Sequence, residues 1–227
     1  MAQISMPRRL NEGFLRPFER PTLLWLARRM PDWVTPNFLT GVGFIGACIV
    51  AAGYALSRWQ PGFLWLATAG LLVNWFGDSL DGTLARVRQI ERPRYGFFLD
   101  QNLDAFEQLI IAFGIGVSGF IRFELAMFTL AAYFLMSILT LVRAVVSNVF
   151  ALTYLGIGLT ELRLAFFILN GLMFFFPPKP LPIVGLWLSY PELLSIAWSA
   201  MMIIAFLMSV KAQLRDLSME DQISGRR

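Results

Sequence analysis

Long apolar stretches separated by short charged segments make up the chain from residue 38 onward. Residues 38–77 contain one charged residue, Arg58, and residues 144–160 contain none. Such runs are typical of helices that cross a bilayer, whose hydrocarbon core needs about 20 apolar residues. The pattern predicts an all-α integral membrane protein with six transmembrane helices, over residues 38–57, 62–78, 103–121, 125–146, 161–177 and 192–210. Residues 181–190 are apolar but too few to span, which predicts a re-entrant or interfacial piece.

Positive charge is distributed unevenly between the two sides of this arrangement. With six spans both termini lie on one side, and that side holds 16 of the 19 lysine and arginine residues. Cytoplasmic loops are enriched in these residues, so both termini are expected in the cytoplasm. The chain then divides into a cytoplasmic leader (1–37), a membrane domain (38–210) and a cytoplasmic tail (211–227).

The leader has the pattern of an amphipathic helix beside the membrane. Apolar residues recur at every fourth position from Leu10 to Phe18, and arginines lie among them. Pro17 and Pro21 predict a break into two short helical pieces. A basic segment with an apolar face suits the anionic cytoplasmic leaflet.

Composition narrows the chemistry that this chain can perform. The 227 residues are 57% hydrophobic and 15% charged, with one cysteine, Cys48, and no histidine. This excludes disulfide scaffolds, histidine-based triads and histidine-ligated zinc. The net charge of +4 follows from arginines in the loops, so we expect no nucleic-acid partner.

Four aspartates lie between the second and third predicted spans. Asp78 and Asp81 are three residues apart and share a helix face. Further along, Gly96, Asp100 and Asp104 follow one another at intervals of four, which again places a glycine and two acids on one face. Two carboxylates about 4 Å apart cost roughly 4 kcal/mol at an effective dielectric constant of 20. A divalent cation would reverse the sign of this repulsion.

The residue types around these acids limit the ligand further. Carboxylate oxygens without histidine or cysteine suit Mg²⁺, Mn²⁺ or Ca²⁺ and do not suit zinc. Gly82, Ala85 and Gly96 carry almost no side chain on the same helix faces. They leave room above the cation for a phosphate or a flat ring that approaches the backbone closely.

At these residues the sequence resembles the CDP-alcohol phosphatidyltransferase family, whose signature is D-x2-D-G-x2-A-R, a linker of eight or nine residues, and G-x3-D-x3-D. Eight fixed positions match, namely Asp78, Asp81, Gly82, Ala85, Arg86, Gly96, Asp100 and Asp104, with nine linker residues. The stretch VTPNFLT, with Asn37 and Thr40, resembles the family's entry to its first span. Six spans after an amphipathic leader also resemble the family's architecture.

The resemblance implies a reaction in phospholipid biosynthesis. A hydroxyl acceptor attacks a CDP-linked alcohol such as CDP-diacylglycerol, a phosphodiester forms and CMP leaves. Mg²⁺ or Mn²⁺ would be held by Asp78, Asp81, Asp100 and Asp104, and Asp104 would also be the general base on the acceptor hydroxyl. The CDP group would contact Asn37, Thr40, Asp78, Gly82, Ala85, Arg86 and Gly96. The resemblance further implies a homodimer among membrane lipids, which we expect in a bacterial inner membrane with the active site at its cytoplasmic face.

The identity of the hydroxyl acceptor stays open at this point. Arg143 and Arg163 lie at the cytoplasmic ends of the fourth and fifth spans, where they could bind an acceptor phosphate or anchor the topology. A CDP-aminoalcohol phosphotransferase acting on a lipid hydroxyl is the alternative. Such members often carry histidine after the third aspartate, where this chain has Gln101, although GIGLTELR at 156–163 resembles one of their motifs.

Two other classes of membrane protein fit the four aspartates less well. Asn74 and Asp78 resemble part of the Mg²⁺-pyrophosphate motif of membrane prenyltransferases, but nine spans would leave too few residues for loops. A cation channel with an acidic ring would place its acids within the spans, whereas these acids lie at the membrane edge.

Overall fold

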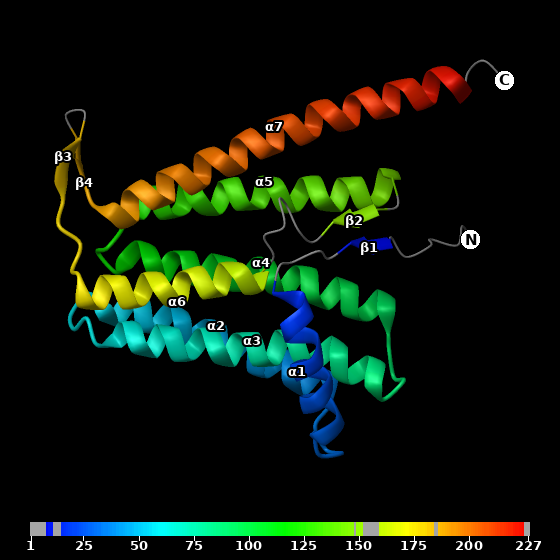
Figure 1. Cartoon of the computed structure of the whole chain (residues 1–227), viewed down its shortest axis with the longest axis horizontal. Helices are drawn as coiled ribbons and strands as arrows, with labels where there is room; N and C mark the ends of the chain where they lie inside the picture. Colours follow the sequence, from blue (N-terminus) through cyan, green and yellow to red (C-terminus); the bar gives the residue numbers. More distant parts are fainter. Residues whose placement is uncertain (1–7, 11–14, 148, 152–158, 184–185, 225–227) are drawn as a thin grey trace.

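The long helices of the computed structural model lie side by side along one common direction, and the first helix crosses them near one end (Figure 1). The structure describes residues 8–10, 15–147, 149–151, 159–183 and 186–224. Its helices are α1 (Arg16–Arg29), α2 (Pro36–Ser57), α3 (Phe63–Val87), α4 (Pro93–Val117), α5 (Phe123–Ser147), α6 (Leu159–Phe175) and α7 (Tyr190–Ser224). Helix α2 packs against α3 and α4, α5 packs against α4 and α7, and α6 packs against α3.

Each of the six predicted spans overlaps one helix, from α2 to α7. Three helices of the described residues, α2, α5 and α7, are long and apolar enough to cross a bilayer. Polar and acidic residues lower the hydropathy of α3 and α4, and α6 has only 17 residues. The three apolar helices indicate a membrane protein, while the six-span topology stays a prediction.

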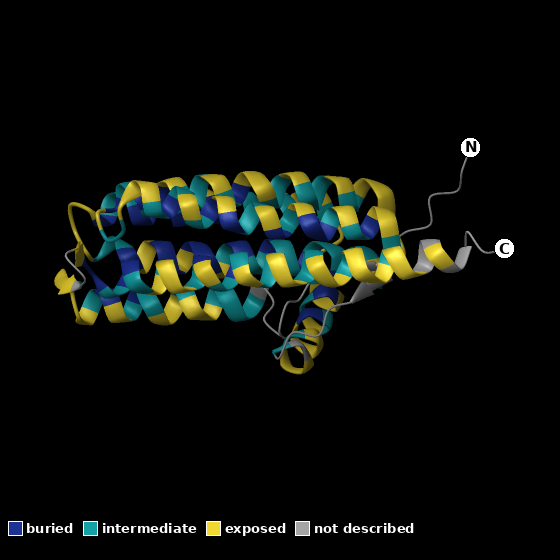
Figure 2. Cartoon of the chain, turned by 90° about the horizontal axis from the view of Figure 1, so that it is seen from above, coloured by how far each residue is buried: buried dark blue, intermediate teal, exposed yellow. Residues whose placement is uncertain are grey.

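Large apolar side chains lie on the outer faces of the bundle. Ile45, Leu72, Phe113 and Leu207 are each more than half exposed. Figure 2 shows exposed residues on the outward faces of the helices and buried residues toward their neighbours. An apolar exterior of this kind suits a hydrocarbon environment.

Helices α2 and α3 approach each other closely because glycines line their contact. A Cβ added at Gly53 would lie 2.7 Å from Ala67 Cα, and one at Gly46 would lie 2.7 Å from Asn74 Cα. Gly77 of α3 faces Gly43 of α2 in the same way. Small residues that let backbones come together are the usual means of packing helices in membranes.

Helix α3 does not end near residue 78, as the predicted span did, but continues to Val87. Gln89 then has a φ of 58°, and the Ile90 N–H donates to the Ala85 carbonyl, which closes the last turn. Helix α4 begins at Pro93, whose missing N–H costs nothing in the first turn of a helix. The acids are therefore carried by two rigid helices with a short connection.

Helix α1 is one continuous helix, so the predicted break into two pieces is wrong. Pro17 lies at its start, and Pro21 is close enough to that end to remove only one hydrogen bond of the helix. Leu23 and Ala27 are buried against the end of α3, and this contact holds the helix together. Its position at a membrane surface stays a prediction.

Two short strand pairs complete the fold. Strand β1 (Arg8–Leu10) pairs in parallel with β2 (Val149–Ala151). Strand β3 (Leu181–Ile183) pairs in antiparallel with β4 (Leu186–Leu188), within the stretch for which we predicted a re-entrant or interfacial piece.

The glycine contact between α2 and α3 yields a prediction about stability. We expect Gly53→Ala to lower the free energy of unfolding by about 1–3 kcal/mol, because the new methyl group overlaps Ala67. The measurement is thermal or denaturant melting of the detergent-purified protein. Gly171→Ala is the matched control, since its Cβ would meet nothing within 4 Å. Equal stability of the two variants would contradict the close contact.

Candidate active site

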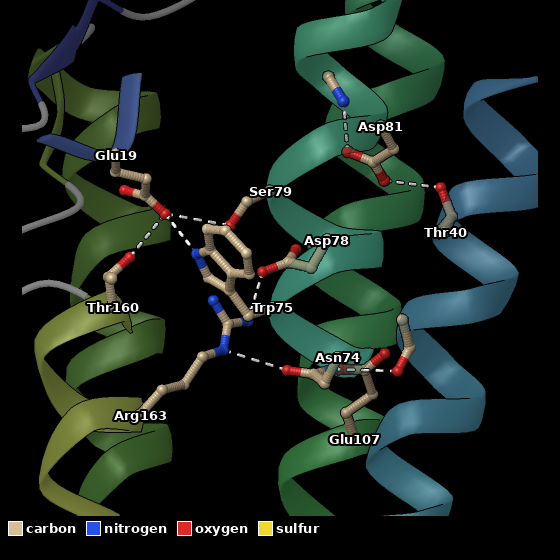
Figure 3. A network of polar contacts seen from close by, with 12 residues as sticks. Glu19, Thr40, Asn74, Trp75, Asp78, Ser79, Asp81, Glu107, Thr160 and Arg163 are labelled. Carbon is tan, nitrogen blue, oxygen red and sulfur yellow. Dashed lines mark hydrogen bonds and ion pairs between the residues drawn. The ribbon is translucent and has the colours of Figure 1, made fainter. Parts of the chain in front are cut away.

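The four aspartates of the sequence signature lie on α3 and α4, and Figure 3 shows Asp78 and Asp81 on α3 between α2 and α6. Asp78 and Asp81 belong to α3, and Asp100 and Asp104 to α4. The charges of Asp78 and Asp100 both act on Asp81 and on Asp104. Asp81 and Asp104 thus share Asp78 and Asp100 as acidic neighbours, and a joint site of all four aspartates stays a prediction.

Asp78 forms an ion pair with Arg163 of α6. The Arg163 Nη2 lies 2.5 Å from Asp78 Oδ2, and both side chains are largely shielded from solvent. The Nε of the same guanidinium donates to Asn74 Oδ1 at 3.1 Å. Arg163, an acceptor-site candidate from the sequence, is therefore part of the acidic site across 85 residues of chain.

Asp81 is oriented by helix α2 and by its own backbone. Its carboxylate accepts from Thr40 Oγ1 at 2.7 Å and from the Gly82 N–H. The pKa of Asp81, which lies beyond the predicted end of the second span, is raised from 3.8 to about 7. Burial is the largest cause, and the charges of Asp78 and Asp100 add to it, while the Thr40 hydrogen bond opposes it. Neither ion pair of the described residues includes Asp81. A bound cation would lower the pKa of this carboxylate.

Open space lies beside the two signature glycines. A Cβ at Gly82 would meet only the flexible guanidinium of Arg86, at 3.5 Å, and a Cβ at Gly96 would meet nothing within 4 Å. Neither glycine is needed for helix packing, in contrast to Gly53. Their small size leaves space beside the two helices, and the binding of a ligand there stays a prediction.

The other residues that the sequence predicts for the site are not all close to the acids. Thr40 is at the site through Asp81, and Asn37 donates to the hydroxyl of Tyr95 on α4 at 3.2 Å. Arg86, at the end of α3, donates to Thr83. Arg143 of α5 takes part in neither of the two ion pairs found among the described residues.

The structure also adds residues that the sequence pattern did not single out for this site. Glu107 is buried and accepts a hydrogen bond from Asn74 at 2.8 Å. It lies three residues after Asp104, so continuing the acidic face of α4 by one more turn would have found it. No sequence signal pairs Asn74 with Arg163, because that contact depends on how α6 docks on α3.

Glu19 of α1 joins the leader to the helices that carry the site. Its Oε1 accepts from Trp75 Nε1 at 2.7 Å, from Thr160 Oγ1 at 2.9 Å and from Ser79 Oγ at 3.3 Å (Figure 3). Arg88 fixes the other end of α1, with its guanidinium on the carbonyls that follow the helix. Helix α1 is thereby fastened to α3 and α6 next to Asp78 and Arg163.

The donor set fits a hard divalent cation, since each candidate ligand is a carboxylate and their charges repel one another. Within the described part of the chain, no three acidic, histidine or cysteine side chains are close enough together to hold a metal ion. Asp78 is turned toward Arg163 and Asp81 toward Thr40. The four-aspartate metal site stays a prediction, and it requires at least Asp78 to change partners.

Comparison with known proteins agrees with the signature. The chain is 34% identical over 113 residues to archaetidylinositol phosphate synthase of Methanothermobacter thermautotrophicus, a match that covers 49% of this chain and 54% of that protein. It is 36% identical over 84 residues to phosphatidylinositol phosphate synthase of Cutibacterium acnes, which covers 37% of this chain and 38% of that protein. The chain thus matches about half or less of the length of these relatives.

The fold is similar to that of Mycobacterium tuberculosis phosphatidylinositol phosphate synthase, whose crystal structure has CDP-DAG bound. The TM-score is 0.51 at 22% sequence identity, and the match covers 88% of this chain and 92% of that one. A sequence profile of the CDP-alcohol phosphatidyltransferase family matches residues 33–211, which include all four aspartates and Arg163. The chain therefore belongs to the CDP-alcohol phosphatidyltransferase family.

Proposed function

We propose that this protein transfers a phospho-alcohol group, such as a phosphatidyl group, from a CDP-alcohol donor to a hydroxyl acceptor and releases CMP. The observation that carries the proposal is the gathering of Asp78 and Asp81 on α3 with Asp100 and Asp104 on α4, beside glycines that leave open space. Charge concentrated in this way suits a cation-bound pyrophosphate. Membership of the family supports the same reaction.

The comparisons favour CDP-diacylglycerol as donor and a phosphorylated polyol as acceptor. The similar structure from Mycobacterium tuberculosis binds CDP-DAG, and the relatives are named for making inositol phosphate lipids. Arg163 supplies a cation within the acidic site, which could bind an acceptor phosphate once Asp78 is engaged elsewhere. A CDP-aminoalcohol donor with a lipid acceptor is the alternative.

The mechanism assigns metal binding to all four aspartates and proton transfer to Asp104 in addition. Asp78, Asp81, Asp100 and Asp104 would hold Mg²⁺ or Mn²⁺, which when bound neutralises the charge of the pyrophosphate. The acceptor oxygen attacks the phosphorus that carries the alcohol, and the bond from this phosphorus to the oxygen of CMP breaks. CMP leaves with that electron pair, while Asp104 takes the proton of the hydroxyl. Gly82, Ala85, Arg86 and Gly96, with Asn37 and Thr40, bind the CDP group.

The helices and the uneven distribution of positive charge support a proposal for the arrangement in the membrane. We propose that α2 to α7 each cross a bacterial inner membrane and that both termini lie in the cytoplasm. Asp78 and Asp81 lie in the second half of α3, and Asp100 and Asp104 lie in the first half of α4. In this arrangement these halves are the ones toward the cytoplasmic face. The homodimer is likewise part of this proposal.

The first prediction tests the reaction itself. We expect CMP release from CDP-diacylglycerol with inositol phosphate, and no turnover in excess EDTA until Mg²⁺ or Mn²⁺ is restored. CDP-choline with diacylglycerol tests the alternative donor and acceptor in the same assay. Full turnover in EDTA would disprove the metal dependence. Pyrophosphate release from a prenyl diphosphate, or ion flux without nucleotide turnover, would disprove the reaction class.

The second prediction tests the open space at Gly82. We expect Gly82→Leu to abolish CDP-donor binding and turnover with a normal melting temperature, because only the movable Arg86 side chain lies near the new group. Gly171→Leu is the control, since it also points into open space but lies on α6 beyond Arg163. Normal nucleotide affinity of Gly82→Leu would show that the pocket lies elsewhere.

The third prediction separates Asp104 from Asp78. Asp104→Asn should keep donor affinity and lose transfer by about 10²–10⁴-fold, the usual effect of losing a general base. Asp78→Asn should weaken donor binding itself. Donor affinity and CMP release are measured for both variants at saturating Mg²⁺. Near-normal turnover of Asp104→Asn would exclude it as the base, and donor binding as weak as that of Asp78→Asn would make it mainly a metal ligand.

A further inference from the structure

Asn74 lies at the centre of a buried polar network one turn before Asp78. Its Nδ2 donates to the Gly43 carbonyl of α2 at 3.1 Å and to Glu107 Oε2 of α4 at 2.8 Å. Its Oδ1 accepts from Arg163 Nε of α6 at 3.1 Å (Figure 3). One side chain of α3 therefore contacts three other helices.

This network leaves the Asn74 amide one orientation. The guanidinium of Arg163 has only donors, while the Gly43 carbonyl and the Glu107 carboxylate have only acceptors. A reversed amide would place its NH₂ against the guanidinium and its oxygen against two other oxygens. Glu107 and Gly43 together thus determine that Asn74 Oδ1 faces Arg163.

Arg163 is in turn held at two points of its planar fork. Its Nε bonds to Asn74 and its Nη2 bonds to Asp78, which lie one turn apart on the same face of α3. Two anchors on one rigid helix fix the plane of the guanidinium in this structure. When Asp78 turns to a cation, as the proposed function requires, the hydrogen bond to Asn74 remains to orient Arg163. A lysine has one ammonium and cannot reproduce this geometry.

We propose that Asn74 and Glu107 are positioning residues that act on the reaction through Arg163. Asn74 is 4% exposed and Glu107 is 6% exposed, so these side chains have little surface to offer a substrate. They hold the guanidinium in the direction from which it binds the phosphate of the acceptor. This inference rests on the proposed function in one respect, the role of Arg163 in acceptor binding.

Four variants test the network by steady-state kinetics with CDP-diacylglycerol and inositol phosphate. Asn74→Leu, Glu107→Leu and Arg163→Lys should raise the KM for the acceptor by about 10- to 100-fold, the usual cost of removing a group that orients a site residue. The KM for the donor should stay near that of the wild type. Glu107→Gln should behave nearly normally, because its amide oxygen still accepts from Asn74.

Asn102→Leu is the matched control. The variant makes the same kind of change on the exposed face of α4. Among the described residues, Asn102 donates a hydrogen bond to the Phe98 carbonyl of its own helix. We expect normal kinetics for this variant. Asn74 packs on Gly46, so Asn74→Leu can disturb the contact between α2 and α3. Glu107 lies outside that contact, so Glu107→Leu tests the network even if Asn74→Leu fails to fold.

The double variant Asn74→Leu/Arg163→Lys decides between positioning and general support of the fold. If Asn74 acts through Arg163, the double variant should be no worse than the poorer single variant. Additive losses, a fall in kcat with no change in acceptor KM, or damage by Glu107→Gln equal to that by Glu107→Leu would each overturn the proposal.

The same cycle measured by thermal melting separates this inference from the proposed function. A wild-type protein that releases no CMP would overturn the proposed reaction. The coupling between Asn74 and Arg163 in melting temperature would still be expected, because it depends only on the hydrogen bond between them. Absence of that coupling would overturn the network.

Discussion

The gathering of negative charge between the second half of α3 and the facing part of α4 is the constraint on which the rest of the structure depends. Carboxylates that are partly removed from water and close to one another raise the free energy of the folded state unless something offsets their charge. Arg163 provides that offset at Asp78, and hydrogen bonds from Thr40 and Asn74 provide part of it at Asp81 and Glu107. The neighbouring helices are placed so that each delivers one of these groups.

The polar contacts are possible because α2 and α3 are packed closely through glycine. The contact at Gly46 lies beside Asn74, and Gly43, within reach of the Asn74 amide, would meet the backbone of Asp78 if it had a Cβ. A larger residue at either position would move α2 away from α3. The same close packing therefore stabilises the bundle and brings backbone carbonyls to the site.

Hydrogen bonds also connect helix α1 of the leader to the bundle. Glu19 accepts three hydrogen bonds from α3 and α6, and Arg88 binds the carbonyls at the end of α1. The leader is thereby fixed relative to the helix that carries Asp78 and the helix that carries Arg163. A segment that the sequence identifies only by its basic and apolar residues is, in the structure, attached to the site.

The amino-acid pattern alone predicts the six long helices and the two acidic faces, because apolar run length and helical spacing are local properties. It also determined the family, because eight signature residues lie within one short segment. It gave no means to pair Arg163 with Asp78, or Asn74 with Glu107, since these contacts join residues 85 and 33 positions apart. It predicts Arg143 and Arg163 equally as acceptor-site residues. The docking of α6 on α3 brings Arg163, and not Arg143, into contact with Asp78. That docking depends on the side-chain shapes of both helices at once, and these shapes meet only in the folded chain.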